Sequence, residues 1–462
     1  MSIPPEHRRL IAAVCAALFF MPFMMSGVNA VLPALGADLG ASARELSLVG
    51  TFYALGLVIF QLTSGSLGDI HGRRRVFMWG VAIFSVSGAM LGFADSMPRF
   101  LVIRFFQGSG GALFNATGLA LLASAAPPSL RPVYLGFSSA AVYAGISCGP
   151  PLAGLIAQWL SWRWLFWINA LTGAAAFLLM RFAVRLEWRT ARDEPFDRRG
   201  FAVYAAAMAC LAFGASELAY GPWRAWTLLG LCGVLLAVFC LMERKVAFPL
   251  MDMNILAGNR RMTLSLLAAF VNYCSFFGMV FFFSIYLQVG RGLDVGTAGI
   301  FLAVQPFMQL VTTPLSAWMC RRGDLGVASA IGAGLCGLGL LAAAFLGLDT
   351  PLWHMLVAQA LLGTGISLFS LSNTNIILES AGSDHVGQGA GLTGTVRNAG
   401  QLFNMGFVTV TLGLFLGHAP VTGQNIGEFM RCMRLDLVVF GVMNLLAIGC
   451  TLARGRVAAP SE

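Results

Sequence analysis

The chain has 462 residues, of which 58% are hydrophobic and only 11% are charged. Soluble domains carry roughly 25% charged residues, so this composition excludes an ordinary water-soluble fold. The formal charge of +9 does not indicate a nucleic-acid partner, because the basic residues fall in short clusters between apolar runs.

Apolar runs of about 20 residues recur along the chain, and each is long enough to cross a hydrocarbon core of ~30 Å as a helix. They are too long and too uniformly apolar for barrel strands, which alternate every second residue. The sequence therefore predicts an all-α membrane protein with about fourteen transmembrane helices. The predicted spans are 10–34, 46–67, 76–94, 99–125, 133–158, 163–186, 200–220, 224–243, 262–289, 296–320, 325–347, 351–377, 386–416 and 433–453.

The basic residues are distributed unevenly over the predicted loops. With the amino terminus in the cytoplasm, about twenty of them lie on inner loops or tails and about seven on outer loops. Because cytoplasmic loops carry the excess of arginine and lysine, we expect a multi-pass protein of the bacterial inner (plasma) membrane with both termini cytoplasmic.

Two charged inner segments, 187–200 and 243–261, bracket the seventh and eighth predicted spans. They indicate two helices inserted between two six-helix halves. The expected domains are an N-terminal six-helix bundle (1–186), a linker with the two inserted helices (187–261) and a C-terminal six-helix bundle (262–462). The stretch from Gly65 to Arg74 weakly resembles that from Leu315 to Gly323, as repeated halves around a midplane site would require.

Several function classes lack their sequence signals. The ten cysteines are scattered without a C-x-x-C spacing, so neither a metal site nor a disulfide framework is predicted, and no cofactor is expected. The single lysine, Lys245, is not part of a G-x-x-x-x-G-K-[ST] loop, which excludes ATP-driven transport by this chain alone. The five histidines are isolated, and no enzyme is predicted.

The most specific signal is the inner turn at 65–75, which combines glycines, one aspartate and three arginines. A positive-inside loop would explain the arginines alone, but not the aspartate or the glycine spacing. The segment resembles the signature G-x-L-a-D-r-x-G-r-[kr] between the second and third helices of the major facilitator superfamily. Its residues are Gly65, Gly68, Asp69, Gly72, Arg73, Arg74 and Arg75.

Three further stretches extend this resemblance over nearly the whole chain. Arg104 with Gln107 to Gly111 is similar to R-x-x-Q-G-x-G of the fourth helix. Gly145, Gly149, Pro150 and Gly154 are similar to the fifth-helix antiporter signature G-x-x-x-G-P-x-x-G-G, and 161–169 resembles the S-W-R-W-x-F-x-x-N stretch of the fourteen-helix drug:proton antiporters. The resemblance implies a major facilitator fold and multidrug efflux by proton antiport with alternating access.

One position departs from that subfamily. Met24 stands where its first helix commonly carries a membrane-embedded aspartate, whereas Asn29, Leu32 and Pro33 match the pattern. A cationic substrate or a proton would lose its most obvious carboxylate. The departure favours neutral, zwitterionic or anionic amphiphiles and leaves proton coupling open.

Charged residues inside spans are costly, and they usually face a bundle interior or a wet cavity. The resemblance assigns Arg104, together with Asp69, to proton coupling, while a helix-to-helix tether is the alternative for Arg104. Arg397 is expected either to attract an anionic substrate group or to pair with an acid at the inner gate.

The loop before the thirteenth predicted span carries only Glu379, Asp384 and His385, whereas the other inner loops are mostly basic. Repeat pseudo-symmetry places this loop opposite the Asp69 turn. We therefore predict a gate in which the arginines of 73–75 pair with Glu379 or Asp384, while Asp69 approaches the amino end of the thirteenth helix.

Polar residues within the spans outline a possible substrate cavity, although helix-to-helix hydrogen bonds would account for about half of the amides. The predicted substrate-binding residues are Asn29, Gln61, Asn115, Tyr143, Asn272, Gln305, Gln309, Asn373 and Arg397.

The expected activity is secondary active export of amphiphilic organic compounds or drugs. The alternatives are a dedicated metabolite exporter, an organic-acid uptake carrier, and a receptor or channel with the same fold. The expected partners are a small amphiphilic substrate, protons and the lipid bilayer, with a periplasmic adaptor and outer-membrane channel as a further possibility.

Overall fold

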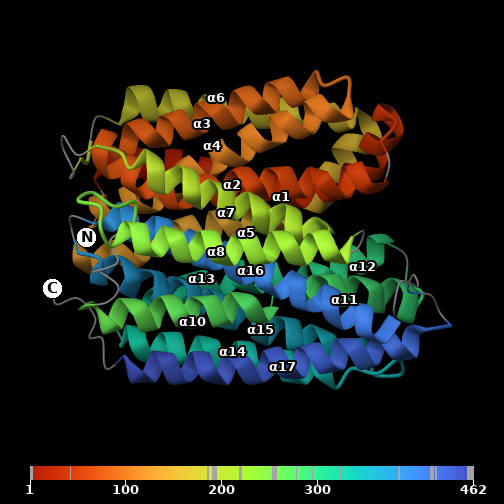
Figure 1. The fold of residues 1–462 in the computed structure, drawn as a ribbon. Helices are drawn as coiled ribbons and strands as arrows, with labels where there is room; N and C mark the ends of the chain where they lie inside the picture. Colours follow the sequence, from red (N-terminus) through yellow and green to blue (C-terminus); the bar gives the residue numbers. More distant parts are fainter. Residues whose placement is uncertain are drawn as a thin grey trace. The chain divides into compact units, whose positions relative to one another are not determined.

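The computed structural model is dominated by long helices (Figure 1), and it describes residues 4–41, 43–184, 187–189, 195–217, 221–251, 258–276, 278–293, 295–322, 324–382, 385–416, 421 and 424–454. These described ranges contain no strand. Helices follow the apolar runs because a segment in hydrocarbon must satisfy its backbone polar groups internally.

The helices have the following bounds in chain order. The first are α1 (Pro5–Leu39), α2 (Ala43–His71), α3 (Arg73–Gly92), α4 (Met97–Ala125), the short 3₁₀ helix η1 (Pro128–Leu130), α5 (Arg131–Trp159), α6 (Trp162–Ala183), α7 (Arg198–Glu217) and α8 (Pro222–Glu243). They are followed by α10 (Arg260–Phe276), α11 (Met279–Ile285), the π-helical turn η2 (Tyr286–Gly290), α12 (Val295–Leu302), α13 (Val304–Arg322), α14 (Leu325–Ala344), α15 (Leu352–Ser380), α16 (Val386–Leu416) and α17 (Ile426–Ala453).

The chain is a multi-pass membrane protein. Among the described residues, eleven helices are long and apolar enough to cross a membrane, or twelve when the two arms of the bent α5 count as one span. Helices occupy all fourteen predicted spans, but α4 and α7 are not among those that pass this test. In α4 the polar residues Arg104, Gln107 and Asn115 lower the hydropathy, and all three are buried. The number fourteen stays a prediction.

Contacts divide the chain into two compact units. The first comprises Met1–Asn259 and Leu378–Thr395, and the second comprises Arg260–Ile377 and Val396–Glu462. Helix α16 therefore begins in the first unit and continues in the second. The expected domain boundaries at 186 and 261 stay predictions.

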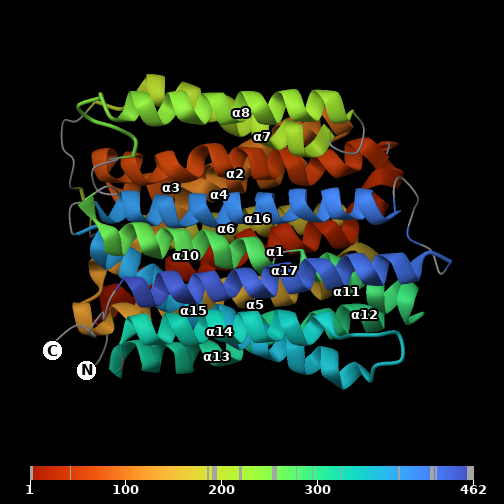
Figure 2. The ribbon, with the colours of Figure 1, turned by 60° about the horizontal axis from the view of Figure 1, so that its bottom comes forward.

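In the first unit α1 packs on α5, α2 on α4, and α3 on both α4 and α6, and Figure 1 shows α3, α4 and α6 side by side. The inserted pair α7 and α8 pack on each other (Figure 2), and α7 also contacts α2. The Tyr204 hydroxyl of α7 donates to the Val58 carbonyl of α2 at 3.1 Å.

In the second unit α17 packs on α14 and α10 (Figures 1 and 2). The core of the second unit is aromatic and aliphatic, and its buried residues include Phe282, Phe283, Leu340, Phe429 and Phe440. In a bilayer, van der Waals packing between the helices rather than removal from water holds such side chains together.

Several predicted boundaries differ from the structure, and the predicted span 296–320 is divided between α12 and α13. Helix α17 begins at Ile426, seven residues before the predicted start at 433, because Glu428, Arg431 and Arg434 interrupt the apolar pattern without interrupting the helix. The predicted span 262–289 is divided into α10, α11 and the π-helical turn η2, a change in hydrogen-bond register that hydropathy does not encode.

Candidate functional site

The inner turn between α2 and α3 depends on one glycine. Gly72 has φ 101°, a backbone conformation that L side chains rarely adopt, and it lies between the last residue of α2 and the first of α3. A Cβ at this position would also lie 2.8 Å from the Glu187 carboxyl carbon. The tight turn sets the end of α2 beside the start of α3.

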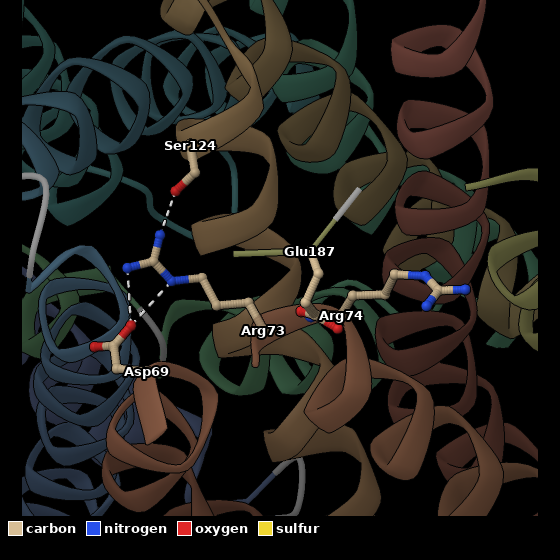
Figure 3. Close-up of polar contacts among 5 residues, drawn as sticks. All are labelled: Asp69, Arg73, Arg74, Ser124 and Glu187. Carbon is tan, nitrogen blue, oxygen red and sulfur yellow. Dashed lines mark hydrogen bonds and ion pairs between the residues drawn. The ribbon is translucent and has the colours of Figure 1, made fainter. Parts of the chain in front are cut away.

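This turn holds a buried ion pair, shown in Figure 3. The Arg73 Nε and Nη2 atoms donate to Asp69 Oδ1 at 2.9 and 2.8 Å, and the two side chains are 1% and 4% exposed. Arg73 Nη1 donates to the Ser124 hydroxyl of α4. The guanidinium therefore ties the ends of α2 and α4 to the start of α3.

Arg74 joins the same turn to the end of α6. Its backbone N–H donates to Glu187 Oε1 at 2.9 Å, and its Nη2 donates to the carbonyls of Met180 and Arg181 at 3.1 and 3.0 Å. Partial burial raises the pKa of the Glu187 carboxyl, while the hydrogen bond from Arg74 opposes this rise. Arg75 is exposed.

The first turn of α16 lies against the end of α2. A Cβ on Gly65 would lie 2.2 Å from the Gly387 carbonyl oxygen, and a Cβ on Gly387 would lie 2.5 Å from each carboxylate oxygen of Asp69. Only glycines permit this approach, and the amino end of a helix favours a nearby negative charge. Asp69 therefore faces both Arg73 and the amino end of α16.

The other predicted gate acids contribute less to the described geometry. Glu379 is exposed in the last turn of α15, and Asp384 lies outside the described residues. Arg73 and Arg74 bind Asp69, Ser124 and the end of α6 instead, so their pairing with Glu379 or Asp384 stays a prediction.

Arg104 lies buried in α4 and has no carboxylate among its described partners. Its Nη1 donates to Gln107 Oε1 at 2.6 Å, and its guanidinium lies 4.5 Å from the centre of the Tyr53 ring. Its Nε has no hydrogen-bond partner in the described part of the chain. A Cβ on Gly108 would lie 2.0 Å from the Tyr53 carbonyl oxygen, so this glycine permits the close approach of α2 and α4.

The glycines of the antiporter-like segment differ in what they contact. A Cβ on Gly145 would lie 2.2 Å from the Phe19 carbonyl oxygen, and one on Gly149 would lie 2.0 Å from the Ser26 hydroxyl, so both permit close packing of α5 on α1. Gly154 has open space around it. The two arms of α5 meet at Pro150 with a bend of 44°.

The 161–169 stretch connects the start of α6 to the end of α1. The Ser161 hydroxyl caps α6 by accepting from the Arg163 N–H at 3.3 Å. The Arg163 guanidinium forms an ion pair with Asp38, and the Trp162 indole donates to the same carboxylate at 3.2 Å. The hydrogen bond from Arg163 is the largest of the effects that lower the pKa of the Asp38 carboxyl.

The predicted substrate-binding residues fall into both units, and several contact each other or neighbouring helices. Asn115 donates to Gln61 at 3.5 Å, Asn272 donates to Asn444 at 2.8 Å, and Asn373 donates to the Ser265 carbonyl at 2.9 Å. The burial of the others differs: Tyr143, Gln305 and Gln309 are buried, Arg397 is half-buried and Asn29 is exposed.

Four polar residues escaped the sequence analysis. Arg454 is buried and donates to Asn373 at 2.7 Å, Asn444 binds Asn272, and Asp38 binds Arg163. Asp436 is fully buried in α17 and lies inside the predicted span 433–453, where it was overlooked. A charged residue flanked by apolar residues at helical spacing was the available signal.

Comparisons with known proteins agree with this fold. The family model of the Major Facilitator Superfamily matches residues 14–405. The tetracenomycin C resistance and export protein of Streptomyces glaucescens is 29% identical over 397 residues, which are 84% of this chain and 73% of that protein. The multidrug resistance protein Stp of Mycobacterium tuberculosis is 27% identical over 398 residues, with the same coverage of 84% and 73%.

The crystal structure of the human organic anion transporter MFSD10 matches 97% of this chain and 100% of its own chain with a TM-score of 0.68. Its sequence identity of 16% supports a shared fold alone. The family match spans the inner turn, the buried arginine of α4 and the glycines of α5. The chain belongs to the Major Facilitator Superfamily.

Proposed function

We propose that this transporter exports amphiphilic organic compounds across the bacterial inner membrane by proton antiport, with both termini in the cytoplasm. The observation that carries the proposal is the buried Asp69–Arg73 pair against the first turn of α16. Both known relatives described above are named for resistance, and one of them for export.

In the proposed cycle the inner turn acts as a latch on the cytoplasmic side. Asp69 is held by Arg73 and favoured by the amino end of α16, and α16 continues into the second unit. Release of this contact would free α16 to move, which is the kind of two-state element that alternating access requires.

Arg104 supplies a second element of the proposal. Its charge is buried beside an amide and an aromatic ring without a carboxylate, so it would lower the cost of a transient negative charge nearby. We propose that this residue links proton movement to substrate movement in the first unit.

A screen in a bacterial strain that lacks its own efflux pumps tests this function. Cells that express the chain are exposed to cationic, neutral and anionic amphiphiles, with and without a protonophore, and an Asp69→Asn variant serves as the control. We expect resistance to at least one neutral or anionic class, which both the protonophore and the variant remove.

Two results would contradict the proposal. Resistance that survives collapse of the proton gradient would reject proton antiport. Increased sensitivity to a compound, together with its faster accumulation, would instead indicate an uptake carrier.

A further inference from the structure

Helix α17 carries one carboxyl group that is fully buried within a membrane span. Asp436 is 0% exposed, and it lies in a helix that qualifies as a candidate span from Ile426 to Ala453. At a rise of 1.5 Å per residue, Asp436 is ~15 Å from one end of the helix and ~25 Å from the other. An ionisable residue that is buried inside a span is costly and points to a function.

The surroundings of Asp436 are almost entirely apolar. Its helix neighbours Cys432, Leu437 and Phe440 are buried in the hydrophobic core of the second unit, as is Val408 of α16. Asp436 Oδ2 lies 2.8 Å from the Thr411 hydroxyl oxygen of α16. Asp436 Oδ1 has no hydrogen-bond partner among the described residues.

The hydrogen-bond inventory at this site favours a neutral carboxyl group. The Thr411 hydroxyl has one proton, and its oxygen also lies 3.1 and 3.0 Å from the carbonyl oxygens of Phe407 and Val408. If Asp436 is protonated, its O–H donates to Thr411, and Thr411 donates to a backbone carbonyl of its own helix. If Asp436 is ionised, the Thr411 hydroxyl must donate to its carboxylate and can no longer donate to the carbonyls of Phe407 and Val408. Asp436 Oδ1 would then carry buried negative charge and accept no hydrogen bond.

No described cation compensates a charge on Asp436. Cys432, one turn earlier on α17, hydrogen-bonds with Thr411. Arg434 donates to the Ala344 carbonyl at 3.2 Å, Tyr286 of η2 donates to the Gly347 carbonyl at 3.0 Å, and Cys336 of α14 hydrogen-bonds with Asn272. The other charged or titratable side chains on α17 and on the elements packed against it are Glu428, Arg431, Cys450, Arg260, Arg261, Tyr273, Cys274 and Arg397.

We propose that Asp436 is a proton-binding site of the transport cycle, loaded in the conformation described here and emptied in another. This inference rests on the proposed proton antiport and names a residue that carries the proton. In the emptied state, water enters the site and the carboxyl transfers its proton to a water molecule, which leaves a solvated carboxylate. Reprotonation reverses the transfer from a hydronium ion on the other side of the membrane. The first helix has Met24 at its expected acidic position, so a membrane carboxyl in α17 would supply what α1 lacks.

Infrared spectroscopy of the purified protein in lipid nanodiscs tests this site without a substrate. The C=O stretch of a protonated carboxyl is recorded while the buffer pH is raised, for the wild type, for Asp436→Asn and for the control Asp349→Asn. Asp349 is an exposed carboxylate in the loop between α14 and α15. The asparagine at 436 keeps the size of the neutral side chain and donates to Thr411 in the same way, so we expect the variant to fold.

In the difference spectrum between wild type and Asp436→Asn we expect a buried carboxyl band that disappears as the pH rises, and we expect no such band in the difference between wild type and Asp349→Asn. The inference is overturned if the difference spectrum between wild type and Asp436→Asn lacks the band, or if this difference band persists at every pH, which would make the group a permanently neutral structural residue. Failure of proton antiport itself would appear in the resistance screen, which is a separate measurement.

Discussion

At the residue scale, two Asp–Arg ion pairs have the same spacing and the same charges and differ in burial, so they show what burial alone adds. Asp69 with Arg73 and Asp95 with Arg99 are both i,i+4 pairs, but the side chains of the first are 4% and 1% exposed and those of the second are 65% and 71% exposed. Loss of one partner from a buried pair costs about 3–5 kcal/mol, because a charge stays in a low dielectric without compensation. We predict that Asp69→Asn abolishes transport while membrane insertion is retained.

The matched control for this prediction is Asp95→Asn, which removes the same group at the same spacing where water screens it. Efflux per unit of protein in the membrane, measured with the best compound of the resistance screen, should be unchanged in Asp95→Asn. Normal efflux by Asp69→Asn would reject the latch, and equal losses in both variants would show that burial is not the cause.

A second residue-scale prediction concerns pH at the Asp38–Arg163 pair. Arg163 lowers the pKa of Asp38, so the pair contributes stability above the ordinary Asp pKa of about 3.9 and loses it as the pH falls through the lowered value. The difference in melting temperature between wild type and Asp38→Asn, measured in detergent, should therefore stay constant from neutral pH down to about pH 5 and close in stronger acid. In an Arg163→Gln background we expect the difference to shrink to the smaller part that the Trp162 indole supplies, and an undiminished difference there would show that Arg163 is not its main source.

The individual side chains show how far sequence reasoning reaches. Asp69, Arg73 and Arg104 could be singled out because charges in or beside apolar runs are rare and their spacing matched a known signature. Asp436 and Arg454 were missed, because each lies close to an end of the predicted span 433–453, where charges are expected, and only the packing of α17 reveals their burial. Partners such as Tyr53 for Arg104 depend on how two helices pack, which no local pattern contains.

At the element scale, Gly65 of α2 and Gly387 of α16 determine how closely the end of α2 and the first turn of α16 approach each other. A Cβ on Gly387 would lie 2.5 Å from the Asp69 carboxylate oxygens, whereas one on Gly413 of the same helix would meet nothing within 4 Å. We predict that Gly387→Ala displaces the first turn of α16 and strongly reduces transport, while Gly413→Ala leaves transport unchanged.

Cross-linking can measure this displacement directly. Ser66 of α2 and Gln388 of α16 line the same hollow, so cysteines at these two positions, in a background whose native cysteines are serine, should react with a short bifunctional maleimide. We expect a lower yield with Gly387→Ala than with Gly413→Ala. An equal yield with normal transport would show that the helix ends need not approach so closely.

Element existence and length were largely predictable, because a hydrocarbon core of ~30 Å requires an apolar helix of fixed length. The positions where a helix is broken or bent were not predictable in the same way. The division of 260–290 into α10, α11 and η2 and the 44° bend of α5 arise from backbone hydrogen bonding and packing, which hydropathy does not encode. Only Pro150, which interrupts the α5 hydrogen-bond ladder, gave a signal for the bend.

At the scale of the whole molecule, the count and direction of crossings decide where the latch operates. Positive residues are concentrated on one set of loops, which favours a cytoplasmic position for both termini and for the Asp69 turn. Within the inserted pair, α8 is long and apolar enough to cross the membrane, whereas α7, like α4, is not among the helices of the described residues that qualify by length and composition. If both helices cross, the loop between them reaches the periplasm.

Fusions to alkaline phosphatase, which is active only in the periplasm, can establish this topology. We predict activity for fusions after Gly221 and after Asp349, and none for a fusion at the carboxyl terminus, where green fluorescent protein should fluoresce instead. An inactive fusion after Gly221 with an active one after Asp349 would mean that α7 and α8 do not cross as a pair, which reduces fourteen crossings to twelve. An active fusion at the carboxyl terminus would place that end outside and would contradict a cytoplasmic latch, since an even number of crossings would carry the Asp69 turn outside with it.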